Sequence, residues 1–266
     1  MPFVSLRNVL ILLPPSEGKS AALAGPTVDP TGLSFPALTP TREAVLTALI
    51  DLCRGDVDVA ATTLGLGPTQ RGEVGANTRL RKEPCAPSID VYTGVLYEAL
   101  DYASLSPTAR RRADEQVAIA SALWGLVRPQ DLIPSYRLSA SSTLPGLGTL
   151  ASAWKGPVSA ELDRVDGLIV DLRSSGYTAL GPVPESAAER AVTVRVLQER
   201  GGKRTVVSHF NKATKGRMVR ALMSSRRTPR TPTAFAQALD ALGFRVETQP
   251  SRKARPVSID VIVDEV

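Results

Sequence analysis

Three side chains able to handle an anion follow an apolar run near the start of the chain. Ser16, Glu17 and Lys19 come directly after the run 10–13 and two prolines. Four consecutive apolar residues predict a buried strand, and prolines end it because they cannot donate to a sheet. A hydroxyl, a carboxylate and an ammonium at a strand end are suited to holding a phosphate or an oxyanion. The alternative is a solvated turn, since Leu13 stands where a phosphate-binding loop requires glycine.

Two guanidinium groups lie close together in a second segment. Arg128, Tyr136 and Arg137 belong to a short connection that contains Pro129 and Pro134. Arginine forks in a rigid loop are suited to binding phosphate or carboxylate. For Arg128 the alternative is a structural pair with a nearby aspartate that pins the loop.

A third polar segment follows another apolar run. Residues 167–172 predict a buried strand, and Arg173 comes next. We expect this strand and the strand over 9–13 to belong to one sheet, with Ser16 and Lys19 near Arg173 at the same edge. The predicted cleft for an anionic small molecule consists of Ser16, Glu17, Lys19, Arg128, Tyr136, Arg137, Arg173 and Lys212. If these residues are instead scattered over a convex face, no pocket for a small molecule is expected.

Basic residues are concentrated in the second part of the chain. The net charge is +6, and residues 200–239 hold ten Lys or Arg and no Asp or Glu. Such a segment should attract phosphates, although a solvated basic face is the simpler interpretation. A helix is predicted over 211–227, and its Lys215, Arg217 and Arg220 are candidate DNA contacts.

The segment around Gly65 and Gly67 has the apolar-Gly-apolar-Gly pattern of a helix-hairpin-helix turn. In that motif glycines allow backbone N–H groups to approach a DNA phosphate, and Arg71 would support the contact. A glycine that ends a helix before a turn produces the same pattern.

Several classes of site are excluded by composition. The one histidine, His209, cannot form a zinc triad and is interpreted as structural, and no metal or cofactor is expected. Cys53 is expected in the core and Cys85 at the surface, where a peroxide-sensing thiol is conceivable. No run of about 18 apolar residues is present for a membrane span, and no leader is evident at the start, so a cytoplasmic protein is expected.

Helix and strand signals alternate along the chain. Proline after Thr39, Ser106 and Thr231 predicts three helix starts. The run 117–127 predicts a buried strand or helix, and residues 193–199 and 205–210 predict a hairpin. Residues 244–248 predict a closing strand. We therefore expect a single α/β domain over residues 1–266, with a mixed sheet flanked by helices and a helix-hairpin-helix-like element.

Four separated segments, 90–94, 122–138, 171–177 and 212–220, together with the opening strand and loop, resemble the YaaA family of bacterial peroxide stress proteins. The resemblance implies a cytoplasmic α/β protein that protects DNA during oxidative stress and binds duplex or branched DNA. It implies no settled enzymatic activity. Two functions are therefore kept open: DNA binding, and an enzyme for a phosphorylated or carboxylated small molecule in a basic cleft.

Overall fold

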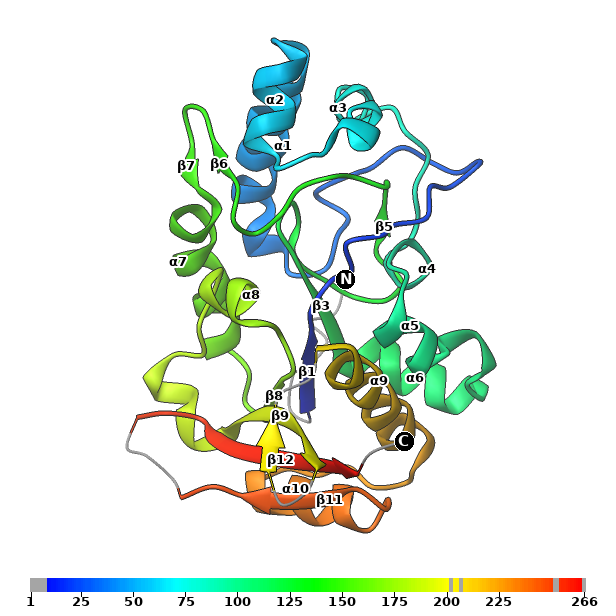
Figure 1. The fold of residues 1–266 in the computed structure, drawn as a ribbon, viewed down its shortest axis with the longest axis vertical. Coiled ribbons are helices and arrows are strands. Elements are labelled where there is room, and N and C mark those ends of the chain that lie inside the picture. The colour runs from blue at the N-terminus through cyan, green and yellow to red at the C-terminus, as the bar shows by residue number, and fades with distance from the viewer. Residues whose placement is uncertain (1–8, 201–202, 206–207, 251–253, 265–266) are drawn as a thin grey trace.

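Strand β1 (Val9–Leu13) lies near the middle of a mixed sheet (Figure 1). The structure, a computed structural model, describes residues 9–200, 203–205, 208–250 and 254–264. The strands follow the order β11-β12-β9-β8-β1-β3-β4, and β10 also pairs with β9. The other strands are β3 (Val117–Ser121), β4 (Gly125–Val127), β8 (Leu168–Asp171), β9 (Ala191–Arg200), β10 (Lys203–Thr205), β11 (Arg245–Thr248) and β12 (Val257–Asp264).

The strands at the centre of the sheet are parallel. β1 pairs in parallel with β3 and with β8, so Leu12 lies opposite Ala118 on one side and Asp171 on the other. β8 and β9, and β9 and β12, are also parallel, whereas β4, β10 and β11 pair antiparallel with their neighbours. Every residue of β1 is buried, as expected for a strand covered on both faces. The carboxyl ends of β1, β3 and β8 consequently share one edge.

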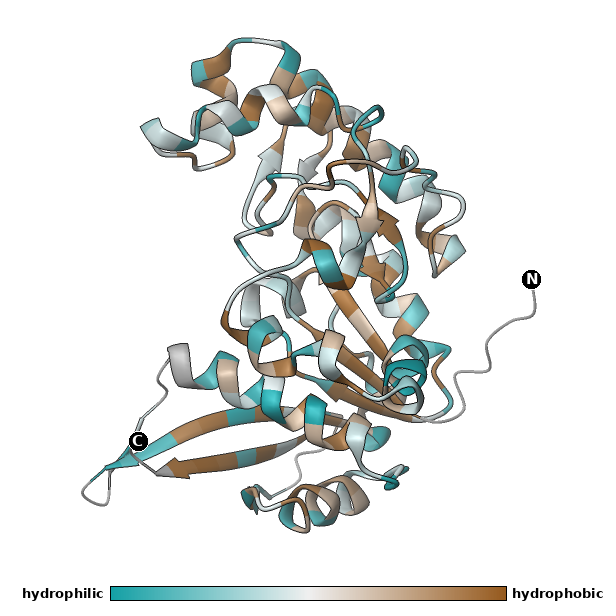
Figure 2. Cartoon of the chain, turned by 90° about the vertical axis from the view of Figure 1, so that its right-hand side faces the viewer, coloured by the Kyte–Doolittle hydropathy of each residue, from teal (hydrophilic) through white to brown (hydrophobic). Residues whose placement is uncertain are grey.

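Helices cover both sides of this sheet. In Figure 1, α5, α6 and α9 lie on one side of β1 and α7 and α8 on the other, while α1 to α3 form the end remote from β11. Figure 2 shows that the most apolar segments are the central strands. The helices are α1 (Thr39–Arg54), α2 (Val57–Thr63), α3 (Gly72–Asn77), α4 (Ser88–Val91), α5 (Val95–Leu100), α6 (Pro107–Gln116), α7 (Leu150–Asp163), α8 (Ser175–Ala179), α9 (Ser208–Ser224) and α10 (Pro232–Asp240). The short elements are η1 (Pro36–Leu38), η2 (Pro68–Gln70), η3 (Tyr102–Ser104), η4 (Glu185–Arg190), β2 (Ala86–Pro87), β5 (Leu132–Ile133), β6 (Thr143–Leu144) and β7 (Gly148–Thr149).

Helix α9 packs against α5 at Gly216. A Cβ atom at this position would lie 2.2 Å from the Leu96 carbonyl oxygen and 2.9 Å from the Ala99 side chain. Only a residue without a side chain allows the two helices to approach this closely. The contact holds α9 in place beside the sheet.

The sequence predicted the α/β class, the mixed sheet and most elements correctly. Residues 9–13 and 167–172 contain neighbouring strands, and helices begin at all three proline signals. At two of them the preceding hydroxyl caps the helix: Ser106 accepts from the Ala109 N–H, and Thr231 from the Ala234 N–H. Thr39, which was expected to cap its helix, is instead the first residue of α1, and no side-chain cap bond forms there.

Four expectations about local structure were wrong. The run 117–127 forms two strands, β3 and β4, joined by a tight turn. The second hairpin strand ends at Thr205, and α9 begins at Ser208. The strand over 244–248, β11, lies at the edge of the sheet but is not the last strand of the chain, because β12 follows it. Cys85 is buried rather than exposed, and burial raises the pKa of its thiol to about 11, which disfavours a reactive thiolate.

Candidate functional site

The loop after β1 is fastened to the segment between α4 and α5. Lys19 forms an antiparallel bridge with Tyr92. The Ser20 N–H donates to the Val91 carbonyl (2.8 Å), and the Thr93 N–H donates to Ser16 Oγ (2.9 Å). These bonds hold residues 16–20 at the carboxyl edge of the parallel strands, where ligand sites of α/β proteins are commonly found.

Lys19 points its ammonium at carbonyl oxygens and aromatic rings. Its Nζ donates to the Ser16 carbonyl (3.0 Å) and the Glu17 carbonyl (3.4 Å). It lies 4.5 Å from the ring centre of Tyr136 and 5.7 Å from that of Tyr92. Burial lowers the pKa of Lys19 to about 8, and the neighbouring Glu17 carboxylate offsets part of this effect.

Tyrosine hydroxyls form a buried network beneath this ammonium. The Tyr92 and Tyr136 hydroxyls lie 2.9 Å apart, and the Tyr136 hydroxyl lies 2.7 Å from Ser121 Oγ. The Tyr97 hydroxyl donates to the Pro14 carbonyl (2.8 Å), and its ring stacks on Tyr92. Burial raises the pKa of Tyr92 to about 12 and raises that of Tyr136 well above its ordinary value, so both hydroxyls stay protonated at neutral pH.

Arg137 borders the same loop. Its Nη1 lies 3.0 Å from Glu17 Oε2 and also donates to the Glu17 carbonyl (3.2 Å). Its backbone is fixed by Asn77, which accepts from the Arg137 N–H and donates to the Arg137 carbonyl. The Arg137 side chain is 18% exposed and that of Glu17 is 70% exposed, so solvent reaches this ion pair mainly from the Glu17 side.

The end of the neighbouring strand β8 carries a fully buried ion pair. Arg173 donates to Asp171 through Nε (2.9 Å) and Nη2 (2.7 Å), and both side chains are almost inaccessible. Lys215 of α9 donates to the Leu172 carbonyl (2.9 Å). Burial lowers the pKa of Lys215, partly offset by the Asp171 carboxylate. The positive charges of Arg173 and Lys215 therefore already have hydrogen-bond acceptors within the protein.

Five of the eight predicted cleft residues therefore come together: Ser16, Glu17, Lys19, Tyr136 and Arg137. Arg173 follows the adjacent strand β8 at the same edge, but its guanidinium is used by Asp171. Lys212 is exposed on α9. That any of them binds a ligand stays a prediction.

Arg128 lies elsewhere. Its guanidinium donates to the carbonyls of Glu115 and Val117, at the amino end of β3, and covers the Phe35 ring. Asp131 accepts from the backbone N–H of Arg128 and from Ser34. Arg128 and Asp131 thus both hold the loop in place. They do so through hydrogen bonds to other groups and not by pairing the Arg128 guanidinium with the Asp131 carboxylate.

Sequence reasoning did not select several residues of this site. Tyr92, Tyr97 and Asp171 lie in or beside segments that carry the family resemblance, and that was the available signal. Ser121 and Asn77 gave none, because their contacts to Tyr136 and Arg137 join residues that are well separated in the chain.

The helix-hairpin-helix element is not confirmed. Helices flank the turn, but the N–H groups of Gly65 and Leu66 donate to the Thr62 and Ala61 carbonyls (3.1 and 2.8 Å), which is a Schellman end of α2. The Gly67 N–H donates to Gln70 Oε1 (3.3 Å). These N–H groups already have acceptors within the protein. The Arg71 guanidinium pairs with Asp58 on the surface.

The three predicted DNA contacts of α9 differ in accessibility. Lys215 is buried against Leu172. Arg220 donates to the Leu100 and Asp101 carbonyls at the end of α5 (3.1 and 2.8 Å) and to Ser104 Oγ. Arg217 is exposed. Of the three side chains, that of Arg217 is the most accessible to a partner.

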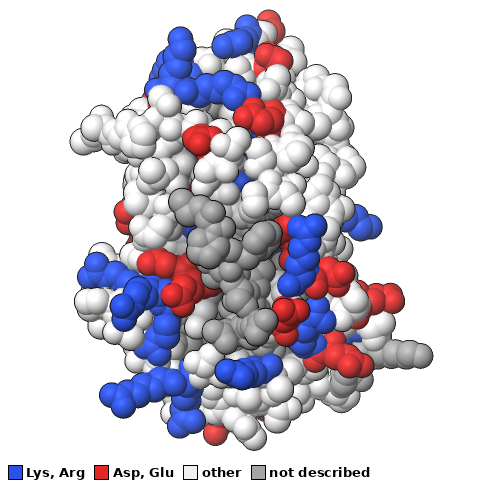
Figure 3. Space-filling view, turned by 180° about the vertical axis from the view of Figure 1, so that it is seen from behind, with Lys and Arg blue, Asp and Glu red and all other residues white. Residues whose placement is uncertain are grey.

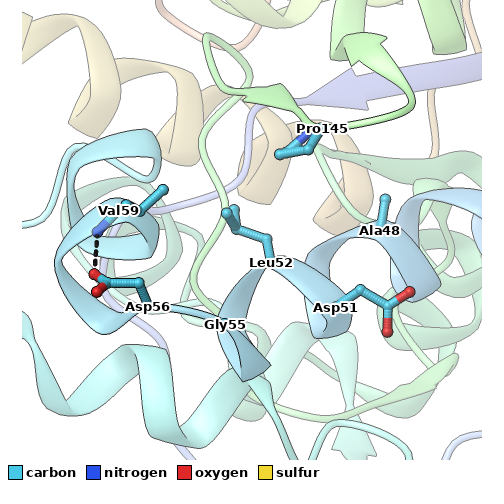
Figure 4. Close-up of a pocket in the computed structure, with 7 residues that line it drawn as sticks. All are labelled: Ala48, Asp51, Leu52, Gly55, Asp56, Val59 and Pro145. Atoms are coloured by element: carbon cyan, nitrogen blue, oxygen red, sulfur yellow. Dashed lines mark hydrogen bonds between the residues drawn. The ribbon is translucent and has the colours of Figure 1, made fainter.

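A shallow hollow of about 370 Å³ lies at the other end of the molecule (Figure 4). It is lined by Ala48, Asp51, Leu52, Gly55, Asp56, Val59 and Pro145. The lining is largely apolar and shares no residue with the Lys19 site.

Among the described residues, no group of three His, Cys, Asp or Glu is arranged to hold a metal ion. Over the same part of the chain, no helix has the length and apolar character needed to cross a membrane.

Comparison with known proteins identifies the family. A family model described as peroxide stress protein YaaA matches residues 9–249. The chain belongs to this family. It is 48% identical to a UPF0246 protein of Streptomyces coelicolor over 97% of this chain and 100% of that protein. A UPF0246 protein of Corynebacterium efficiens is 44% identical over 92% of this chain and 97% of its own length. A UPF0246 protein of Salinispora tropica is 30% identical over 85% and 86%.

Proposed function

We propose that this peroxide stress protein binds DNA through the phosphate backbone, by basic residues on α9 and in the segment that follows it. The proposal is supported by one group of side chains. Arg217, Arg226, Arg227 and Arg230 are exposed, and none of them forms an ion pair with a described residue. Cations without partners attract phosphates more strongly than paired ones, because no internal carboxylate has to be displaced.

A second arginine-rich helix adjoins this surface. Arg112 of α6 donates to the Ser225 carbonyl, next to the end of α9. Arg111, its neighbour in the sequence, is exposed. The contact brings basic residues that are more than a hundred positions apart in the chain to one region. We name Arg111, Arg217, Arg226, Arg227 and Arg230 the α9 surface.

Charge of both signs is present on the face seen from behind. Figure 3 shows Lys and Arg side chains next to Asp and Glu side chains at several places on that face. Some of the exposed cations are paired: the Arg204 guanidinium contacts both Glu199 and Glu247. Binding to the backbone of duplex or branched DNA requires distributed positive charge rather than base contacts. We assign this positive charge to the α9 surface. The proposal also places the protein in the cytoplasm, where bacterial DNA lies.

Fluorescence anisotropy with a labelled duplex tests this assignment. We expect Arg226→Gln/Arg227→Gln to bind the duplex several-fold more weakly than the unmodified protein, irrespective of DNA sequence. Arg54→Gln is the matched control. Arg54 is also exposed, and it ends α1 at the far end of the molecule (Figure 1). Equal losses in both variants, or none in either, would contradict the assignment.

A second function is supported by the Lys19 site. Lys19 and Arg137 place an ammonium and a guanidinium beside one loop at the carboxyl edge of the sheet. This arrangement suits a small carboxylated or phosphorylated molecule. Calorimetric titration with small carboxylates and phosphates tests it, and unchanged heats in an Arg137→Gln variant would argue against the site.

A further inference from the structure

The side chains of Lys19 and Arg137 meet at a single oxygen atom. Lys19 Nζ lies 3.4 Å and Arg137 Nη1 3.2 Å from the Glu17 carbonyl oxygen. An amine and a guanidinium are therefore held side by side by one backbone group. A short molecule with one end at the amine would have its other end near the guanidinium.

The two nitrogen groups differ in what else they contact. The ammonium of Lys19 is held by neutral groups, namely backbone carbonyls and two tyrosine rings, and no described carboxylate pairs with it. Arg137 has a carboxylate partner, Glu17, whose side chain is largely exposed. A ligand carboxylate can replace an exposed carboxylate on a guanidinium with little loss of hydrogen bonding. Arg137 is thus suited to an anion, and Lys19 to a reaction of its free amine.

We propose that Lys19 is a nucleophilic amine that forms an imine with a short oxo acid whose carboxylate binds Arg137. The inference rests on the second function proposed above and names its substrate class. The Nζ lone pair adds to the carbonyl carbon, and a proton moves from nitrogen to oxygen to give a carbinolamine. The C–O bond then breaks, water leaves, and the C=N bond forms.

The protonation state of Lys19 agrees with this role. With its pKa lowered to about 8, the amine is far more reactive at neutral pH than a solvated lysine. At pH 7.5 roughly a quarter of Lys19 would be neutral, against about one in a thousand for an unperturbed lysine. Arg137 contributes to this shift, because its positive charge disfavours a second one nearby.

Reductive trapping tests the proposal on the full chain. The protein is incubated at pH 7.5 with glyoxylate and cyanoborohydride, and each labelled lysine is located by peptide mass spectrometry. We expect Lys19 to be labelled at least about tenfold faster than the exposed Lys82 and Lys155. In Arg137→Gln, the ratio of glyoxylate labelling to propanal labelling at Lys19 should fall about tenfold, because propanal carries no carboxylate. Labelling of Lys19 no faster than that of Lys82 would overturn the proposal.

Lactate separates this proposal from the second function on which it rests. Lactate has the carboxylate but no carbonyl group, so it can bind at Arg137 without forming an imine. If lactate binds in calorimetry and Arg137→Gln abolishes the binding, yet Lys19 is not trapped, the anion site stands and the imine is refuted. If lactate does not bind and glyoxylate does not label Lys19, both are refuted. Retained denaturation midpoints show whether the Arg137→Gln variant is folded.

Discussion

The Lys19 ammonium lies 4.5 Å from the ring centre of Tyr136, whose hydroxyl is bonded in turn to Tyr92 and Ser121. The contact joins the loop after β1 to the connection that follows β5. A cation over a ring is attracted by the electrons of the ring face. In this site the Glu17 carboxylate, two carbonyl hydrogen bonds and this attraction together offset part of the cost of burying the charge.

The pH dependence of stability follows from the pKa of Lys19. The pKa falls from an ordinary 10.5 to about 8 on folding. Between these values the unfolded chain binds more protons at this lysine than the folded protein does, so its contribution to the free energy of unfolding rises with pH. The stability of the unmodified protein relative to Lys19→Met should therefore increase between about pH 8 and pH 10.5, as measured by urea denaturation. A constant difference over this interval would contradict the shifted pKa.

The buried pair of Arg173 and Asp171 should be sensitive to the loss of one partner. Arg173→Met leaves the Asp171 carboxylate buried without its guanidinium partner, and we expect a loss of about 3–5 kcal/mol in the free energy of unfolding. Replacing both residues, as Asp171→Asn/Arg173→Met, should recover much of this loss. Arg79→Met, which breaks the exposed pair with Glu83, should cost under about 1 kcal/mol. Similar small losses for Arg173→Met and Arg79→Met would show that the buried charge is solvated.

Alanine should have opposite effects at a glycine in the contact between α9 and α5 and at a glycine with open space around it. Gly216→Ala would push α9 away from Leu96, and we expect a loss of about 1–3 kcal/mol. Gly156 is within α7 and has open space around it, so Gly156→Ala should raise stability by up to about 1 kcal/mol. Thermal denaturation of the two variants measures both effects. A stabilising Gly216→Ala would mean that the helices are not in close contact.

Two glycines of the turn after α2 should also behave differently. Gly65 has a φ of 65°, which disfavours other residues, so Gly65→Ala should cost about 1 kcal/mol. Gly67 has an ordinary φ and space for a side chain, so Gly67→Leu should leave the thermal midpoint nearly unchanged. We also expect it to leave duplex affinity unchanged, because the Gly67 N–H already donates to Gln70. A selective loss of DNA binding would instead support a helix-hairpin-helix contact.

The parts of the fold that were predictable are those in which one local signal decides the structure. Strands β1 and β8 are buried on both faces and therefore appear as unbroken apolar runs. The polar residues that follow each run identified the edge of the sheet on which Lys19 and Arg173 lie.

The position of Arg128 is set by a turn within the run 117–127, and the apolar sequence of that run gives no sign of the turn. A single strand would have carried Arg128 to the carboxyl edge, near Lys19. Because the chain reverses before Gly125, which has a φ of 74°, Arg128 returns to the amino end of β3. Periodicity within a fully apolar run does not reveal such a reversal.

Burial of Lys215 was missed for a related reason. It lies four residues before Val219 and therefore on the apolar face of α9, where its long stem packs and its ammonium reaches the Leu172 carbonyl. Assigning charges to the solvent side of a helix is correct on average and failed at this position. The tyrosine network was likewise not predictable, because its partners are separated by up to about 80 residues.

The salt dependence of duplex affinity tests DNA binding by the α9 surface most directly. Each phosphate that an arginine neutralises releases condensed counterion, so log affinity should fall with log salt at about −0.9 per contact. For the five arginines of the α9 surface we predict a slope of about −4 to −5. The slope should become shallower by about two in Arg226→Gln/Arg227→Gln and stay unchanged in Arg54→Gln. An affinity that does not vary with salt, or a slope that the double substitution leaves unchanged, would contradict the proposal.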